Sequence, residues 1–177
     1  VRYKAVPAGE FTETAIHRLT GSRARLLACL PVRKERSGGY VTIRGSAQIL
    51  DRLRHLILET EERLYLALDS HLLVRYREEV ASVCRAGKKL VVITARSAIE
   101  SQDLAREFPG AELHGTETEP AEIRAIADSR FVLTGDMPEG ESDASCLFSD
   151  ERNLVELFKS ALKNEILLAD LAVKEKP

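Results

Sequence analysis

Residues 40–95 read YVTIRGSAQILDRLRHLILETEERLYLALDSHLLVRYREEVASVCRAGKKLVVITA. Three short runs of strand-forming residues alternate here with two amphipathic segments, whose apolar residues recur at helical spacing. The predicted strands are YVTIRGS with its turn, RLYLALD and KKLVVITA, and the predicted helices are QILDRLRHLILE and HLLVRYREEVASVCRAG. This alternation of strands and helices indicates an α/β domain.

Polar and glycine residues mark the ends of the two helices. We expect Ser46 to cap the first helix and Asp69 or Ser70 to cap the second, because short polar side chains accept hydrogen bonds from free amides there. Gly87 can adopt the left-handed conformation that ends a helix. The unbroken apolar run at 90–93 predicts a strand covered on both faces, as is usual in a parallel sheet.

Further elements flank this unit on both sides. A long helix is predicted from Asp150 to the end, and at about 36 Å it could reach a partner chain or a further domain. Before the unit, the sequence predicts an extended Val1–Pro7, a helix over Phe11–Leu30 and a polar connector at 33–39. After it, the sequence predicts a short helix at Ser97–Phe108, a strand at Ala111–His114, and a hairpin of Glu122–Ala127 and Phe131–Thr134 about Asp128, Ser129 and Arg130. A loop at 137–143 and a strand at Ala144–Phe148 follow.

The helix predicted near the N-terminus has an apolar seam. Ile16, Leu19, Leu26 and Leu30, together with Arg23, alternate at spacings of three and four, which is the pattern of a coiled coil. Two heptads fit equally well a single helix that packs on the domain. Both interpretations stay open.

Composition and charge indicate a globular chain in two parts. The 177 residues are 44% hydrophobic and 31% charged. We expect a linker and dimerisation segment at 1–36 and a domain at 37–177. Residues 1–36 carry eight basic and three acidic side chains, whereas the rest carries 18 basic and 25 acidic ones. The acidic domain is therefore a poor binder of nucleic acid, and the basic segment could lie near DNA or be a solvated helix face.

Other features favour a cytoplasmic protein. No apolar run approaches the roughly 20 residues that a membrane span needs, and no signal-peptide pattern is present. Cys29, Cys84 and Cys146 are far apart and odd in number, so a reducing compartment is the simpler interpretation. We expect Cys84 and Cys146 to be buried thiols.

A candidate ligand site follows from the strand ends. In open α/β sheets, ligands bind beyond the carboxyl ends of the strands, and helix N-termini there favour anionic or oxygen-rich groups. If the three strand ends converge, the ligand-binding residues are Gly45, Ser46, Asp69, Ser70, His71, Thr94 and Arg96. Alternatively, Ser46 and Asp69 are only helix caps.

Signatures of catalysis and of cofactor binding are not found. The four histidines show no metal-ligand spacing, and no glycine-rich phosphate loop or Gly-x-Ser-x-Gly sequence occurs. Glu117, Glu119 and Glu122 are close together, but a solvated loop explains them. We therefore expect no catalytic residues, no metal and no cofactor.

Several segments together resemble a known family. EIRAIADSRFVLTGD followed by DASCLFSDERNLVELF resembles the phospholipase D-like fold, and the whole pattern more closely resembles the sensor region of TrmB-like transcriptional regulators. The resemblance also rests on YVTIRGSAQILDRLRHLI, RLYLALD, AGKKLVVITA and YKAVPAGEF. It implies a mixed sheet with helices on both faces, an N-terminal linker helix and a long C-terminal helix.

The same resemblance counts against catalysis. Phospholipase D-type enzymes use a His-x-Lys pair with an aspartate further on, and Asp128 matches that aspartate. The positions then expected for the histidine and lysine are Ala121 and Ile123, which can supply neither a nucleophile nor a charge.

The family implies a regulatory role. We expect an effector-sensing, dimeric, non-catalytic domain, with DNA bound through a winged helix preceding Val1. A sugar or another small molecule is the expected effector. We expect the chain to lack the C-terminal sugar-binding domain that some members have, which would place a ligand in this domain or at its dimer interface. The alternatives are a purely structural dimerisation module without a ligand and a divergent phosphodiesterase.

Overall fold

The computed structural model describes residues 7–29, 39–136 and 144–174, with side chains to Leu171. The contacts divide the chain into two units, residues 1–36 and 37–177. In the first unit, α1 (Ala8–Cys29) is one continuous helix through Gly21, and none of its residues is buried. The predicted helix is confirmed and begins three residues earlier than expected. The predictions for Val1–Val6 and for 30–38 lie outside the described residues.

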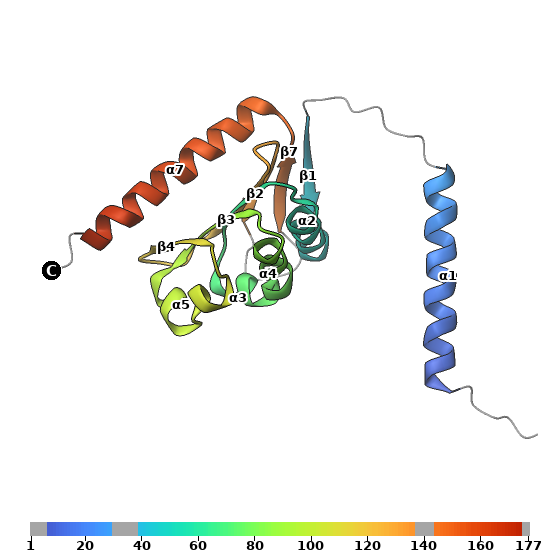
Figure 1. The fold of residues 1–177 in the computed structure, drawn as a ribbon. Helices are drawn as coiled ribbons and strands as arrows, with labels where there is room; N and C mark the ends of the chain where they lie inside the picture. Colours follow the sequence, from blue (N-terminus) through green and yellow to red (C-terminus); the bar gives the residue numbers. More distant parts are fainter. Residues whose placement is uncertain (1–6, 30–38, 137–143, 175–177) are drawn as a thin grey trace, which may run out of the picture. The chain divides into compact units, whose positions relative to one another are not determined.

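The second unit contains a seven-stranded mixed sheet in the order β1-β7-β6-β5-β2-β3-β4 (Figure 1). Parallel pairing joins β2 to β3 and β3 to β4, and all other neighbours are antiparallel. The strands are β1 (Tyr40–Arg44), β2 (Arg63–Ala67), β3 (Lys89–Ala95), β4 (Glu112–Thr116), β5 (Glu122–Ala127), β6 (Phe131–Asp136) and β7 (Ser145–Ser149).

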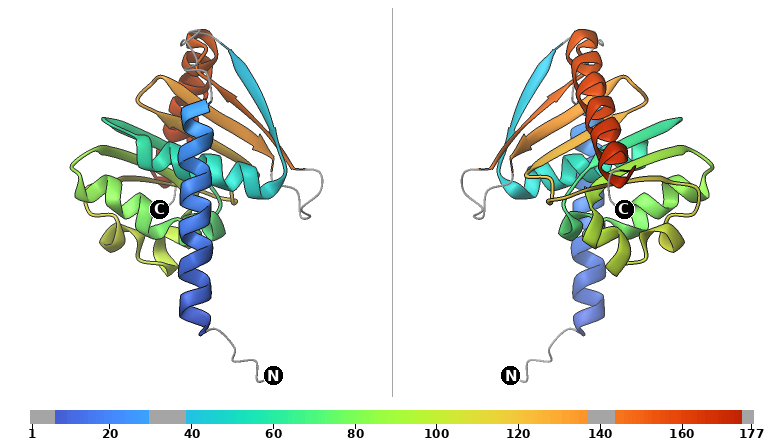
Figure 2. Two further views of the ribbon diagram at one scale, coloured as in Figure 1. Left: turned by 90° about the vertical axis from the view of Figure 1, so that its right-hand side faces the viewer. Right: turned by 90° about the vertical axis from the view of Figure 1, so that its left-hand side faces the viewer.

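Helices cover both faces of this sheet, as the sequence predicts (Figure 1). One face carries α2 (Ser46–Glu59), α3 (Ser70–Arg75), α4 (Arg77–Arg85), α5 (Arg96–Ser101) and α6 (Leu104–Glu107). The other face carries α7 (Arg152–Lys174), which runs across the strands (Figure 2). Alternation along β2 explains the two layers, because Leu64 and Leu66 pack beneath α2 whereas Tyr65 and Ala67 pack beneath α7.

Local signals account for most of these elements. All of β3 except its first residue is buried, as its apolar run predicts. Asp69 caps α3 by accepting from the Leu72 amide at 2.7 Å, and Gly87 follows α4 at φ 70°. The hairpin of β5 and β6 turns at Asp128 and Ser129, both with positive φ.

Three details of the sequence-based prediction were wrong. Ser46 is the first residue of α2 and caps nothing, because Gly45 at φ 89° holds the cap position without a side chain. The helix predicted over 71–87 is divided at Tyr76, whose buried hydroxyl donates to the Leu50 carbonyl of α2. The helix predicted over 97–108 is divided into α5 and α6, because Asp103 between them is left-handed at φ 49°.

The expectation for the cysteines is confirmed for one of them. Cys146 is buried, and this burial, followed by the charge of Asp136, raises the pKa of its thiol to about 11. Cys84 is only partly buried and Cys29 is exposed. The Cys146 thiol is therefore protonated and unreactive near neutral pH.

Candidate functional site

The structure brings five of the seven predicted ligand-binding residues to one place. Asp69, Ser70 and His71 begin α3 after β2, while Thr94 and Arg96 lie at the end of the adjacent β3. The Thr94 side chain is fully buried and the His71 side chain is exposed. The parallel pairing of β2 with β3 accounts for this grouping.

The other two residues lie elsewhere on the same edge of the sheet. Gly45 and Ser46 follow β1, which is separated from β2 by β7, β6 and β5. Four strand spacings amount to about 19 Å. The Gly45 amide instead donates to the Ala144 carbonyl at 2.9 Å, beside β7. The strand ends therefore do not converge on one cleft, because the order of strands along the chain is not their order in the sheet.

A carboxylate of the chain itself lies at the strand ends. Glu119, from the loop after β4, accepts a hydrogen bond from the Ser70 amide at 3.1 Å and one from the Thr94 hydroxyl at 3.4 Å. It takes the contacts that an anionic ligand would make. The sequence predicts Glu119 in a solvated loop. Its side chain is exposed, as predicted, but it also accepts these two hydrogen bonds. Ligand binding by these strand-end residues stays a prediction.

Replacing Glu119 with alanine should lower the free energy of unfolding by about 0.5–1.5 kcal/mol, because it leaves the Ser70 amide and the buried Thr94 hydroxyl without their acceptor. Glu117→Ala is the matched control, since Glu117 is an exposed carboxylate of the same loop. Urea unfolding of the two variants measures the difference. Equal midpoints for both variants would show that the Glu119 contacts contribute nothing.

The region that resembles a phospholipase D motif contributes to the core and to a turn. Ile123 is buried in the apolar core, with 2% of its surface exposed. Asp128 accepts hydrogen bonds from the amides of Glu61, Glu62 and Arg63 at 2.8–3.0 Å. Partial burial opposes ionisation of Asp128, but these amides and nearby Lys88 outweigh it and hold its pKa below the ordinary value. This aspartate therefore fixes the turn between α2 and β2.

Two polar contacts attach the C-terminal half of α7 to the sheet. Arg124 of β5 forms a two-pronged ion pair with Glu165 at 2.7 and 2.9 Å. The His114 Nδ1 of β4 lies 2.9 Å from the Asp170 carboxylate. These polar contacts add to the apolar packing of Val155, Leu162 and Ile166 on the sheet.

A second concave site lies between α7 and the amino-terminal ends of β2, β3 and β4. It has a volume of about 440 Å³, and its lining includes Tyr65, Lys89, Val91, Lys159 and Lys163. The sequence-based prediction concerned only the carboxyl ends of the strands and did not include this site. One signal was available, because Lys159 and Lys163 are four residues apart and must share a helix face.

Metal and membrane features are not found in the described part of the chain. Residues 7–29, 39–136 and 144–174 hold no group of three or more metal-ligating side chains. None of the helices described here combines the length and apolar character that crossing a bilayer requires.

Solved structures with low sequence identity share the fold. TrmBL2, an archaeal chromatin protein that binds DNA, is 15% identical at a TM-score of 0.59, over 89% of this chain and 64% of that one. The chain thus spans less than two thirds of TrmBL2. NucT from Helicobacter pylori is 14% identical at a TM-score of 0.55, over 75% of this chain and 97% of that one.

A phospholipase D family member extends this comparison. Nuc from Salmonella typhimurium is 14% identical at a TM-score of 0.52, over 72% of this chain and 93% of its own. The domain therefore has a phospholipase D-like fold, as the sequence predicts. Fold alone assigns no activity.

The comparison with protein families is more specific. Among curated proteins the chain finds no match. The family model for the transcriptional regulator TrmB, EBD N-terminal subdomain, matches residues 39–163. This match covers most of the chain and nearly all of the sheet-containing unit. The chain therefore belongs to the TrmB family of transcriptional regulators, with the N-terminal subdomain of the effector-binding domain at residues 39–163.

Proposed function

We propose that this chain is the effector-sensing and dimerisation region of a TrmB-type regulator, and that it has no catalytic activity. The family match over residues 39–163 carries the proposal. It is supported by the apolar Ile123 at the position where an enzyme of this fold would place its catalytic lysine. In such a regulator, DNA binding belongs to a winged helix and the protein acts in the cytoplasm.

Dimerisation is proposed through α1. The helix exposes Ile16, Leu19 and Leu26, with 64%, 70% and 63% of their surfaces accessible. A helix of 22 residues is marginal in water unless its apolar face packs against another surface, and we propose that a second copy of α1 covers this seam. Dimerisation here would place two DNA-binding heads side by side.

Sensing requires that an effector favour one arrangement of the dimer over another. Thermal melting with sugars, sugar phosphates, nucleotides and small organic acids tests this role. A ligand at one hundred times its dissociation constant adds about 2.7 kcal/mol of stability, which a melting curve detects. We expect at least one class to raise the melting temperature. If none does, the chain is a structural dimerisation module.

Hydrolysis of bis-p-nitrophenyl phosphate tests the enzymatic alternative. We expect no release of nitrophenol above the buffer rate. Turnover that disappears in a His71→Ala or His114→Ala variant would contradict the non-catalytic assignment. A variant of either histidine that melts normally rules out unfolding as the cause.

A further inference from the structure

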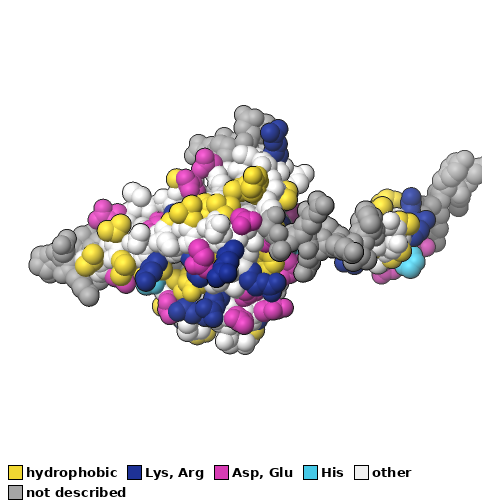
Figure 3. Space-filling model, turned by 90° about the horizontal axis from the view of Figure 1, so that it is seen from above, with side chains coloured by type: hydrophobic (Ala, Val, Ile, Leu, Met, Phe, Trp, Pro, Cys, Tyr) yellow, Lys and Arg dark blue, Asp and Glu magenta, His cyan; other side chains and the backbone are white. Residues whose placement is uncertain are grey.

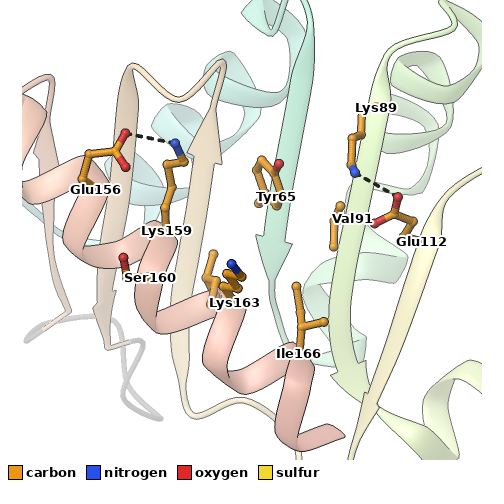
Figure 4. Close-up of a pocket in the computed structure, with 10 residues that line it drawn as sticks. Tyr65, Lys89, Val91, Glu112, Glu156, Lys159, Ser160, Lys163 and Ile166 are labelled. Atoms are coloured by element: carbon orange, nitrogen blue, oxygen red, sulfur yellow. Dashed lines mark hydrogen bonds and ion pairs between the residues drawn. The ribbon is translucent and has the colours of Figure 1, made fainter. Parts of the chain in front are cut away.

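The site between α7 and the sheet combines an apolar floor with a charged rim. Tyr65 and Val91 of the strands and Leu162 and Ile166 of α7 together form the floor. Figure 4 shows Tyr65 between the lysines of α7 on one side and the Lys89–Glu112 pair on the other. The volume of about 440 Å³ suits a small organic ligand.

The rim carries one positive charge in excess. Lys89 pairs with Glu112 at 2.9 Å, and Lys159 pairs with Glu156 at 3.0 Å. Lys163 also lines the site and has no ion-pair partner among the described residues. From above, basic and acidic side chains gather beside a band of hydrophobic ones on the sheet-containing unit (Figure 3).

We propose that this site binds a small organic monoanion with an apolar, ring-sized body, such as an aromatic carboxylate. The floor would desolvate the body of the ligand, and Lys163 would contact its anionic group. A nucleotide polyphosphate carries more negative charge than the rim can balance.

This inference rests on the proposed sensing role, for which it names the site and the class of effector. One wall is α7 and the other is the sheet, so occupancy must favour one position of the helix on the strands. The contacts of Glu165 with Arg124 and of Asp170 with His114 set the position of the far half of α7 on the strands. A bound anion would thus be reported by the orientation of α7.

Fluorescence titration with 8-anilinonaphthalene-1-sulfonate tests the site, because this probe has an aromatic body and one negative charge. The uncharged N-phenyl-1-naphthylamine, of nearly the same shape, should bind at least about fivefold more weakly. Lys163→Gln should weaken binding of the anionic probe by about three- to tenfold. Arg152→Gln is the control, since it removes the same charge from an exposed position of α7 outside the lining.

Two further variants separate this site from non-specific binding. Ser160→Trp fills the pocket from an exposed helix position, and should weaken binding at least about tenfold. Glu156→Gln releases Lys159 from its ion pair, and should tighten binding by about two- to fivefold. A merely structural role of Glu156 would not produce tighter binding.

Two outcomes distinguish failure of the proposed site from failure of the proposed dimeric sensor. Equal affinities of the parent, Lys163→Gln and Ser160→Trp proteins, each with a normal melting curve, would overturn the proposed site. Probe binding that follows the expected pattern in a chain that sedimentation shows to be monomeric would keep the site and contradict the dimeric sensor.

Discussion

Replacing Leu19 and Leu26 with glutamate should raise the dissociation constant of the proposed α1 dimer at least about 100-fold, so that the chain becomes a monomer. The two leucines are seven residues apart on α1 and lie on one face. In the proposed dimer, two copies of each leucine would lose their apolar contacts. The new glutamates would also repel one another across the interface.

Sedimentation equilibrium over a range of concentrations measures this change. Arg18→Glu with Arg25→Glu is the matched control, because it places two glutamates at the same spacing on α1 but outside the seam. We expect the control to remain a dimer. Equal dissociation constants for the parent and the leucine variant would show that α1 is not the dimer interface.

The strand and helix pattern of residues 40–95 could be predicted because its causes are local. Apolar spacing, a cap at Asp69 and a left-handed Gly87 all act within one turn of chain. The hairpin at Asp128 and Ser129 is equally local, since both residues tolerate positive φ better than branched residues do. Such elements can be predicted without knowing which distant residues they contact.

The arrangement of the predicted ligand site could not be derived in the same way. The distance from Gly45 to Asp69 depends on β1 pairing with β7, and the paired residues Tyr40 and Ser149 are more than one hundred positions apart in the chain. Periodicity within a strand carries no information about which strand lies beside it. The contacts of Glu119 depend likewise on how a loop folds back over the strand ends.

The pocket beside α7 could not be predicted from the sequence either. Lys89 begins β3 and Lys163 lies in α7, and only the tertiary fold brings them to one rim. The rule that ligands bind at carboxyl strand ends predicts a site at the opposite edge of the sheet. In this chain, Glu119 already makes contacts at that edge, whereas the edge with Lys163 remains open.

Replacing Asp128 with alanine should lower the free energy of unfolding by about 1.5–3 kcal/mol, because the amides of Glu61, Glu62 and Arg63 lose their acceptor together. Because solvent reaches this turn, water can partly replace the missing acceptor and limit the loss of stability. The melting temperature should fall by roughly 5–10 °C for a domain of this size. Alanine also tolerates the left-handed backbone of residue 128 poorly.

Asp128→Asn separates the charge from the backbone effect. Asparagine accepts the left-handed conformation and keeps one carbonyl oxygen, so the loss should be smaller than with alanine. Asp103→Asn is the matched control, because Asp103 is another left-handed aspartate and its side chain makes no cap hydrogen bond. This control should leave the free energy of unfolding unchanged.

The effect of Asp128 should also depend on pH. Its pKa is lower in the folded state than the ordinary aspartate value of 3.8, so its ionised form stabilises the fold above that value. This contribution is lost as the pH falls through the folded pKa. The stability difference between the parent and Asp128→Asn should be constant from pH 7 to about pH 5 and shrink below about pH 4. A difference that did not change with pH would show that the charge is irrelevant.

The contacts of Asp128 explain why an aspartate can persist where catalysis is not expected. Asp128 is the one residue here that matches the phospholipase D pattern, and its oxygens are engaged by three backbone amides. Ile123, at the position of the catalytic lysine, lies in the core. If Asp128 is structural, its variants will lose stability and retain probe binding in the α7 pocket at temperatures where they are folded. Loss of binding in a folded Asp128 variant would instead link this turn to the sensing site.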